Sequence, residues 1–170
     1  MRPEDEAEFA GLVERQWRFA YKVAWAVLRN KQDAEDAAQE VFLKILRTRA
    51  WRAIRDERAF VARAGWREAI TRVRGRRPDG GEDMDALVSA AASPEDKVTA
   101  GDWEAAVHRL IDSLPEELRQ PLALSAEMNS REIAAAMGIA EGTVRTRLMR
   151  ARGILREKIL AMEARRYAQR

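Results

Sequence analysis

The sequence predicts an all-α protein, and three observations favour that fold class. Apolar residues recur at intervals of three and four along most of the 170 residues. Ala, Arg and Glu, which favour helices, are prominent, and Gly and Pro gather at a few breaks. The composition, 46% hydrophobic and 35% charged, is typical of a globular chain. We expect two small helical domains, 1–77 and 103–170, joined by a flexible acidic linker over 78–102.

The composition also limits the chemistry. There is no cysteine, which excludes disulfides and thiolate metal sites and fits a reducing compartment. One histidine, no Gly-rich phosphate loop and no carboxylate set with metal-ligand spacing predict no catalytic residue, cofactor or metal. The acidic N-terminus lacks the apolar core of a signal peptide, and no apolar run is long enough to cross a membrane. We therefore expect a soluble cytoplasmic protein, with no membrane insertion, that is not an enzyme.

Two helices are predicted at the start of the chain. Over about 5–28, Phe9 and Val13 begin an apolar stripe at helical spacing. A second helix is predicted over 33–48, with Asp33 as its N-cap.

The second helix has two contrasting faces when its residues are placed at about 100° steps. The apolar residues from Ala38 to Ile45 point into a core. The opposite face consists of Asp36, Gln39, Glu40 and Leu43. Such a face is either solvated or binds a protein, and a leucine framed by carboxylates favours a protein partner with basic side chains.

Residues 47–77 form a strongly basic segment with Trp51, Phe60 and Trp66 among its arginines. Its periodicity is helical, and Gly65 could introduce a kink. Guanidinium groups suit phosphates and rings suit unstacked bases, so the segment is typical of a nucleic-acid surface. The alternative is a basic helix whose aromatic residues are all buried, and the segment alone leaves both open.

The chain reverses its charge at 78–102, where acidic residues accompany prolines and glycines. This composition indicates a linker that does not bind DNA. A helix is predicted over 103–114, and another starts near Pro115, a position where proline is tolerated. Pro121 should end or bend that helix.

Residues 129–152 have the pattern of a helix-turn-helix. Asn129 can cap the first helix in a capping box with Glu132. Close crossing of the two helices needs a small residue in the first helix and an apolar residue in the second, and the turn between them needs a glycine. The residues at these three positions are Ala134, Gly138 and Val144.

The second helix of this motif is cationic opposite its apolar face, which suits a DNA major groove. Its cations are Arg145, Arg147, Arg150 and Arg152. An ordinary helical hairpin with solvated arginines is the alternative.

Two separated patterns together resemble the sigma-70 family of bacterial RNA polymerase sigma factors. They are DAEDAAQEVFLKIL near the start, and LPEELRQPLALS followed by EIAAAMGIAEGTVRTRLMRAR near the end. The layout, without a globular domain between the two, is similar to the extracytoplasmic-function (ECF) group. The resemblance covers roughly residues 8–160 and depends on both patterns occurring in this order.

The resemblance implies a promoter-specificity subunit that binds core RNA polymerase, recognises the −10 and −35 promoter elements and promotes DNA opening. It places the face of Asp36, Gln39, Glu40 and Leu43 against the β′ clamp helices. It assigns −10 recognition and melting to the segment around Phe60–Arg77, with Arg63, Trp66, Arg67, Arg74, Arg76 and Arg77 as candidates. The helix-turn-helix domain would read the −35 element and contact the β flap, and the linker would pass near the active centre and RNA exit path. The resemblance places Thr143, Arg145, Thr146 and Arg147 at the positions that approach DNA. Helical geometry refines this assignment, giving base edges to Arg145, Thr146 and Arg150, and phosphates to Arg147 and Arg152. An anti-sigma factor is an implied partner.

The sequence departs from the family's pattern in three respects. The family has an Arg-Asn pair followed by an Asp in the melting helix, whereas this chain has Trp66-Arg67 and Thr71. The stretch before Glu132 is about two residues shorter and lacks the family's Gly, so the preceding helix is expected to pack differently.

A stand-alone helix-turn-helix regulator that binds duplex DNA without polymerase is the alternative function. Such a regulator usually needs a dimer interface or an effector domain, and the sequence shows neither.

Overall fold

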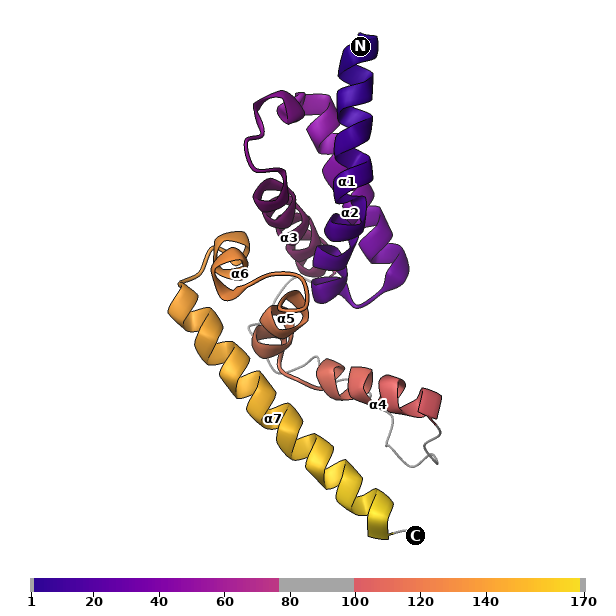
Figure 1. Cartoon of the computed structure of the whole chain (residues 1–170), viewed down its shortest axis with the longest axis vertical. Coiled ribbons are helices and arrows are strands. Elements are labelled where there is room, and N and C mark those ends of the chain that lie inside the picture. Colours follow the sequence, from indigo (N-terminus) through magenta and orange to yellow (C-terminus); the bar gives the residue numbers. More distant parts are fainter. Residues whose placement is uncertain (1, 77–99, 169–170) are drawn as a thin grey trace.

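The computed structural model describes residues 2–76 and 100–168, which form helices and turns without strands (Figure 1). The predicted all-α fold class is therefore confirmed. Arg77 and residues 78–99 of the predicted linker lie outside the described residues. Residues 100–102 belong to a helix rather than to a linker.

The N-terminal group contains three long helices and one short 3-10 helix. They are α1 (Pro3–Leu28), α2 (Lys31–Thr48), η1 (Ala50–Ala53) and α3 (Glu57–Gly75). Asn30 is the N-cap of α2, and its side-chain oxygen accepts a hydrogen bond from the backbone N–H of Asp33 at 3.0 Å. Asp33 was predicted to be the N-cap of this helix, and that prediction was wrong. Asn30 is the N-cap because its side chain binds the backbone N–H of Asp33, which has no partner within the helix.

Small side chains bring the three long helices close together. α1 packs against both α2 and α3. The alanines that are fully buried between them are Ala20, Ala24, Ala34, Ala37, Ala38 and Ala69. A Cβ added to Gly65 of α3 would lie 3.3 Å from Cγ1 of Val23 in α1. Because α3 continues through Gly65 as one helix, this glycine serves close packing rather than the suggested kink.

The C-terminal group contains four helices. They are α4 (Ala100–Asp112), α5 (Glu116–Leu124), α6 (Ser130–Met137) and α7 (Glu141–Ala168). Pro121 lies inside α5 and is fully buried, and the helix continues past it to Leu124. The last turn is closed by Ser125, whose backbone N–H donates to the Pro121 carbonyl at 3.0 Å and whose hydroxyl donates to the Leu122 carbonyl at 2.6 Å.

The helix-turn-helix formed by α6 and α7 has the predicted local structure. Asn129 accepts the backbone N–H of Glu132 at 2.9 Å, and the Glu132 carboxylate accepts that of Asn129 at 2.8 Å. Gly138 ends α6 with φ 69°, a left-handed conformation that glycine adopts at low cost. Ala134 and Val144 are buried at the crossing of the two helices. The capping box, the turn and the crossing are all confirmed.

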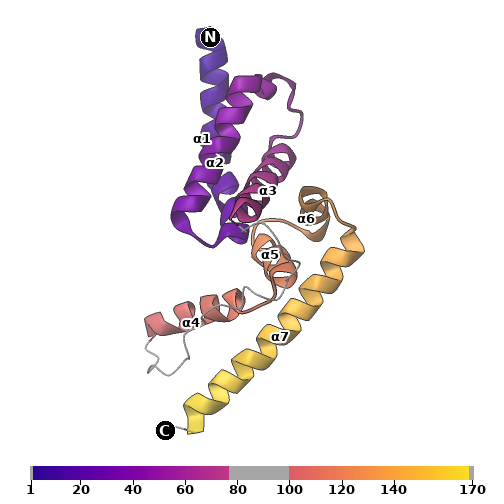
Figure 2. The same cartoon turned by 180° about the vertical axis from the view of Figure 1, so that it is seen from behind.

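The two groups of helices pack directly against each other. α5 lies against α1, and α6 lies against α3. The two opposite views show α6 beside α3, while α7 runs away from the N-terminal group toward the C-terminus (Figures 1 and 2).

Candidate partner-binding and nucleic-acid interfaces

The acidic face of α2 points outward, as predicted. Gln39 is exposed, and Asp36, Glu40 and Leu43 are half-buried. Asp36 accepts a hydrogen bond from Gln32 at 3.0 Å, and Glu40 lies 3.5 Å from Nη1 of Arg47. Both carboxylates are therefore engaged only by side chains of their own helix, which leaves the face accessible to a partner.

A groove of about 790 Å³ adjoins this face between α1 and α2. Trp17 and Tyr21 of α1 line it together with Asp36 and Gln39. Trp17 is 37% exposed and stacks on Phe42 with ring centroids 5.8 Å apart. The exposure of Trp17 could not be predicted from the sequence, because its spacing places it with the apolar stripe of α1.

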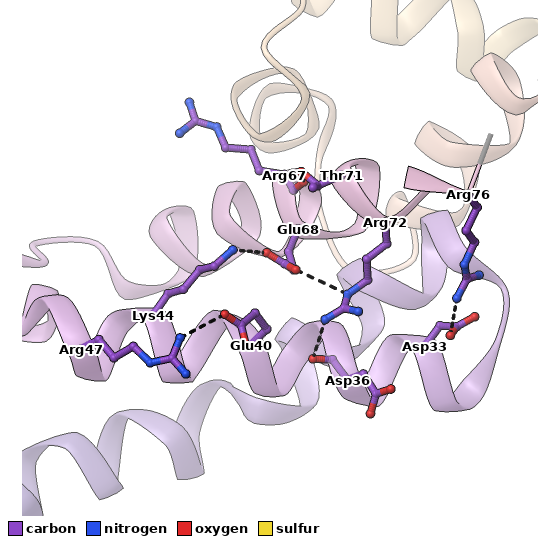
Figure 3. Close-up of polar contacts among 10 residues, drawn as sticks. All are labelled: Asp33, Asp36, Glu40, Lys44, Arg47, Arg67, Glu68, Thr71, Arg72 and Arg76. Atoms are coloured by element: carbon purple, nitrogen blue, oxygen red, sulfur yellow. Dashed lines mark hydrogen bonds and ion pairs between the residues drawn. The ribbon is translucent and has the colours of Figure 1, made fainter. Parts of the chain in front are cut away.

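Side chains of α3 hold the acidic face of α2 in position (Figure 3). The buried carboxylate of Glu68 pairs with Nζ of Lys44 at 2.5 Å and with Nε of Arg72 at 3.4 Å. Arg72 also donates to the backbone carbonyl of Asp36 at 3.3 Å. These contacts explain why a basic helix packs beside an acidic one.

The predicted −10 candidates differ in their surroundings in the structure. Arg63, Arg67 and Arg74 are exposed, and at about 100° per residue they share one stripe of α3. Figure 3 shows Arg67 pointing away from α2. Trp66 is half-buried against the core, and Arg77 lies outside the described residues.

Arg76 is not free, because it pairs with Asp33 at the start of α2. Its Nη2 lies 2.5 Å from Oδ1 of Asp33. This hydrogen bond lowers the pKa of the Asp33 carboxyl and raises the pKa of the Arg76 guanidinium. Arg76 therefore fastens the end of α3 to α2, a structural role that the sequence does not indicate.

The aromatic residues of the basic segment serve the core more than the surface. Trp51 is buried against Phe9, with ring centroids 5.4 Å apart. Phe60 and Trp66 are half-buried and pack against the core. A smaller groove of about 270 Å³ is lined by Phe60 together with Val41 and Arg67.

The predicted DNA-binding face of α7 is open. Thr143, Thr146 and Arg150 are exposed and line a groove of about 400 Å³ with Arg147 and Glu117. Glu117 belongs to α5, far enough from α7 in the sequence that helical periodicity did not indicate it.

Two further cations flank that face. Arg145 pairs with Glu141 one turn earlier, with Nη2 and Oε1 2.6 Å apart. Arg152 is exposed on the next turn of the helix.

The described residues give no sign of an ion site or a membrane helix. No group of three or more His, Cys, Asp or Glu side chains is placed to hold a metal ion within 2–76 and 100–168. None of the helices in these ranges is long and apolar enough to cross a membrane.

Both groups of helices match known family models. Residues 12–78 match sigma-70 region 2, and residues 104–155 match sigma-70, region 4. The chain is 32% identical to the ECF RNA polymerase sigma-E factor of Escherichia coli, over 84% of this chain and 83% of that protein. It belongs to the sigma-70 family of RNA polymerase sigma factors, in the ECF group.

Other relatives agree with this assignment. The RNA polymerase sigma-H factor of Pseudomonas aeruginosa is 32% identical over 79% of each chain. The match to the sigma factor RfaY of Xanthomonas campestris is 30% identical and spans 81% of this chain but 37% of that longer protein. The fold is similar to that of CnrH, solved in complex with the cytosolic domain of CnrY, with a TM-score of 0.62 and 24% identity over 90% of this chain and 88% of that one.

Sigma factors are the non-enzymatic subunits that give RNA polymerase its promoter specificity, and that is the function of this chain. The alternative of a stand-alone regulator is not favoured, since region 2 and region 4 occur together in the order of a sigma factor.

Proposed function

We propose that this sigma factor binds the β′ clamp helices of core RNA polymerase through Asp36, Gln39, Glu40 and Leu43. The observation that carries the proposal is an outward acidic face with a leucine, bordered by an open groove. Two carboxylates on one face attract a basic partner surface, and the leucine and the groove offer apolar contact. The bonds from α3 to α2 keep this face rigid, so little order has to be gained on binding.

We further propose a division of labour between residues 1–77 and 103–170. The first would bind core polymerase and recognise and melt the −10 element, and the second would read the −35 element and contact the β flap. The linker over 78–102 would pass near the active centre and the RNA exit path. The whole process takes place in the cytoplasm.

For the −10 element, the exposed stripe of Arg63, Arg67 and Arg74 would hold phosphates. Trp66, Arg76 and Arg77 complete the proposed surface. The groove between α2 and α3 is lined by apolar side chains, such as Val41 and Phe60, and by polar ones that include Arg67. Such a site suits an unstacked base, and capture of unstacked bases favours the open duplex.

For the −35 element, α7 would enter the major groove with its N-terminal turns. Base edges would be contacted by Arg145, Thr146 and Arg150, and phosphates by Arg147 and Arg152, with Thr143 at the groove entrance. The support is that this face is exposed while Val144 and Leu148 on the opposite side are buried.

An anti-sigma factor is the remaining proposed partner. CnrH, whose fold this chain shares, was solved with the cytosolic domain of another protein bound to it. We propose that this sigma factor is likewise held by a protein partner until a signal releases it.

The test reverses the charge of the proposed polymerase face. In Asp36→Lys/Glu40→Lys, both carboxylates become cations, and we expect loss of binding to core polymerase with an unchanged helical circular dichroism spectrum. The reason is that neither side chain has a partner in the buried core. Glu14→Lys is the matched control, since Glu14 is an exposed carboxylate of α1. Unchanged core affinity in the double variant would refute the assigned face.

A run-off transcription assay tests the function as a whole. Core polymerase with this sigma factor should initiate at specific promoters selected from a randomised library, and core polymerase alone should not. Tight, sequence-specific binding of duplex DNA by the free chain, without any initiation in the presence of core, would contradict the proposal.

A further inference from the structure

Three large apolar side chains of α7 are exposed to solvent. Met149, Leu160 and Tyr167 are 67%, 58% and 75% exposed, and among the described residues the only other exposed large apolar side chain is Trp17 of α1. At about 100° per residue, the three side chains on α7 lie within about 20° of one another around the helix. Single exposed apolar side chains need no explanation, whereas a line of them along one face indicates a surface for another molecule.

This stripe is on the outer side of α7, away from the helices that pack against it. Ala151 is buried in a cluster with Leu118 of α5, and Nζ of Lys158 donates to the Ser113 hydroxyl at 2.7 Å. Around the helix, Ala151 and Lys158 lie about 180° and about 160° from Leu160. Both views show α7 along the outer edge of the molecule (Figures 1 and 2). A second molecule would therefore have to supply the partner of the stripe.

Most of the stripe lies outside the family match. Region 4 matches up to residue 155, whereas α7 continues to Ala168. Leu160 and Tyr167 belong to this additional segment. The family assignment therefore gives the second half of α7 no role.

The stripe is complementary in shape to itself when two copies of α7 run antiparallel. If Leu160 of one copy meets Leu160 of the other, residues equally far on either side of Leu160 face each other. Gly153 then faces Tyr167 of the second copy. A Cβ added to Gly153 would meet nothing within 4 Å, so there is room at this position for the aromatic ring.

The charges along one edge of the stripe match in the same arrangement. Arg156 and Glu163 are exposed and lie about 40° and about 60° from Leu160, on the same edge. A two-fold axis across an antiparallel pair places each edge beside the same edge of the second copy. Arg156 of each copy therefore lies beside Glu163 of the other. Within the described part of the chain, neither side chain has an ion pair that would compete.

We propose that α7 is a self-association surface, on which a second copy of this chain docks antiparallel about Leu160 over residues 153–167. The paired segment is roughly 21 Å long, so the interface is of the small, transient class. It begins after residues 143–150, which carry most of the proposed −35 surface. The self-association therefore does not depend on the proposed function.

Sedimentation velocity of the full chain tests the proposal. Monomer should convert to dimer as the concentration rises from roughly 5 to 500 µM, the range suited to a weak complex. Arg156→Glu and Glu163→Arg should each weaken the dimer about tenfold, because each replaces two ion pairs with two like-charge pairs. An equimolar mixture of the two variants should dimerise as well as the natural protein, because the opposite charges then face each other again. Arg165→Glu, an exposed cation about 140° from Leu160, is the matched control and should change nothing.

Cross-linking tests the register. The chain has no cysteine, so Leu160→Cys provides one thiol that a short bis-maleimide should join to the same thiol of a second copy. Met149→Cys, on the same stripe but outside the paired segment, should not be joined to itself. A chain that stays monomeric throughout the concentration range, or a dimer that neither charge variant weakens, would overturn the proposal. Cross-linking of Tyr167→Cys to itself would also overturn it, because that contact requires parallel helices.

Discussion

At the scale of single residues, the face of α7 that we propose reads the −35 element combines cations with carboxylates. Glu117 of α5 is exposed and lines the same groove as Thr146 and Arg150 of α7. Arg145 pairs with Glu141, and this carboxylate offsets part of the positive charge of the guanidinium. A carboxylate at a DNA-facing groove repels phosphate and can contact only donors on base edges.

The first prediction concerns Glu117. Glu117→Gln should tighten binding to −35 duplexes roughly two- to fivefold whatever their sequence, the effect of removing one exposed like charge. Fluorescence anisotropy of the holoenzyme with duplexes of different −35 sequence measures it. Glu163→Gln, an exposed carboxylate near the far end of α7, should have no effect. Weaker binding confined to duplexes with one particular base pair would contradict this and assign base reading to Glu117.

The second prediction compares two glycines, Gly138 at the end of α6 and Gly153 inside α7. Gly138 has φ 69°, and a Cβ there would meet nothing within 4 Å, so Gly138→Ala should cost about 1–2 kcal/mol of the free energy of unfolding through backbone strain alone. Gly153 lies inside α7 with equally open space, so Gly153→Ala should stabilise by about 0.5–1 kcal/mol. Urea unfolding measures both. The same sign for the two variants would refute the explanation.

At the scale of helices, the sequence predicts elements well and their boundaries less well. The capping box at Asn129 could be predicted because all its partners lie within four residues. The N-cap of α2 could not be predicted, because Asn30 and Asp33 both suit that position. The choice depends on where α1 ends, and α1 ends at Leu28 with Arg29 as its C-cap. Pro121 stays inside α5 because it is buried there, and burial depends on neighbours remote in the sequence.

The candidate surfaces follow the same rule. The outward face of Asp36 and Gln39 follows from the period of one helix, and the structure confirms its exposure. The pairing of Arg76 with Asp33 joins two helices, so an arginine that looked free for DNA has a structural partner. Assignments that depend on one helix could therefore be predicted, whereas those that depend on helix–helix contacts required the structure.

The third prediction concerns the pair that fastens α3 to α2. Since Arg76 lowers the pKa of Asp33 below its ordinary value of 3.8, the pair stabilises the folded state above that pH and loses its effect as pH falls through the lowered pKa. Arg76→Gln should thus be less stable than the natural protein near neutral pH, and the difference should shrink below about pH 4. Arg74→Gln, an exposed neighbour, should show no such trend. Thermal melts across pH 3 to 7, each variant against the natural protein, measure this. A difference that persisted unchanged into acid would contradict the role of Asp33.

At the scale of the whole molecule, the packing of the two groups of helices against each other could not be predicted from the sequence. Lys22, Arg29 and Arg58 lie in three different stretches, and each resembles an ordinary solvated cation when its helix is considered alone. Lys22 pairs with Glu127, Arg29 with Asp112 and Arg58 with Glu132. Each carboxylate lies more than 69 residues further along the chain than its cation, 69 being the separation of Arg58 from Glu127, whose backbone carbonyl it also contacts. Only the three-dimensional structure brings the two sets of charges together.

The fourth prediction concerns cooperativity. Because one buried cluster runs through both groups of helices, the free protein should unfold in a single calorimetric transition. Nη2 of Arg58 in α3 donates to the backbone carbonyl of Glu127, and its Nε lies 3.6 Å from Oε1 of Glu132 in α6. Arg58→Glu places a carboxylate against these two acceptors, so the two groups should unfold in two transitions. Arg55→Glu should keep the single transition, because Arg55 is an exposed cation. Two transitions already present in the natural protein would refute the prediction, because they would mean that the buried cluster does not couple the two groups.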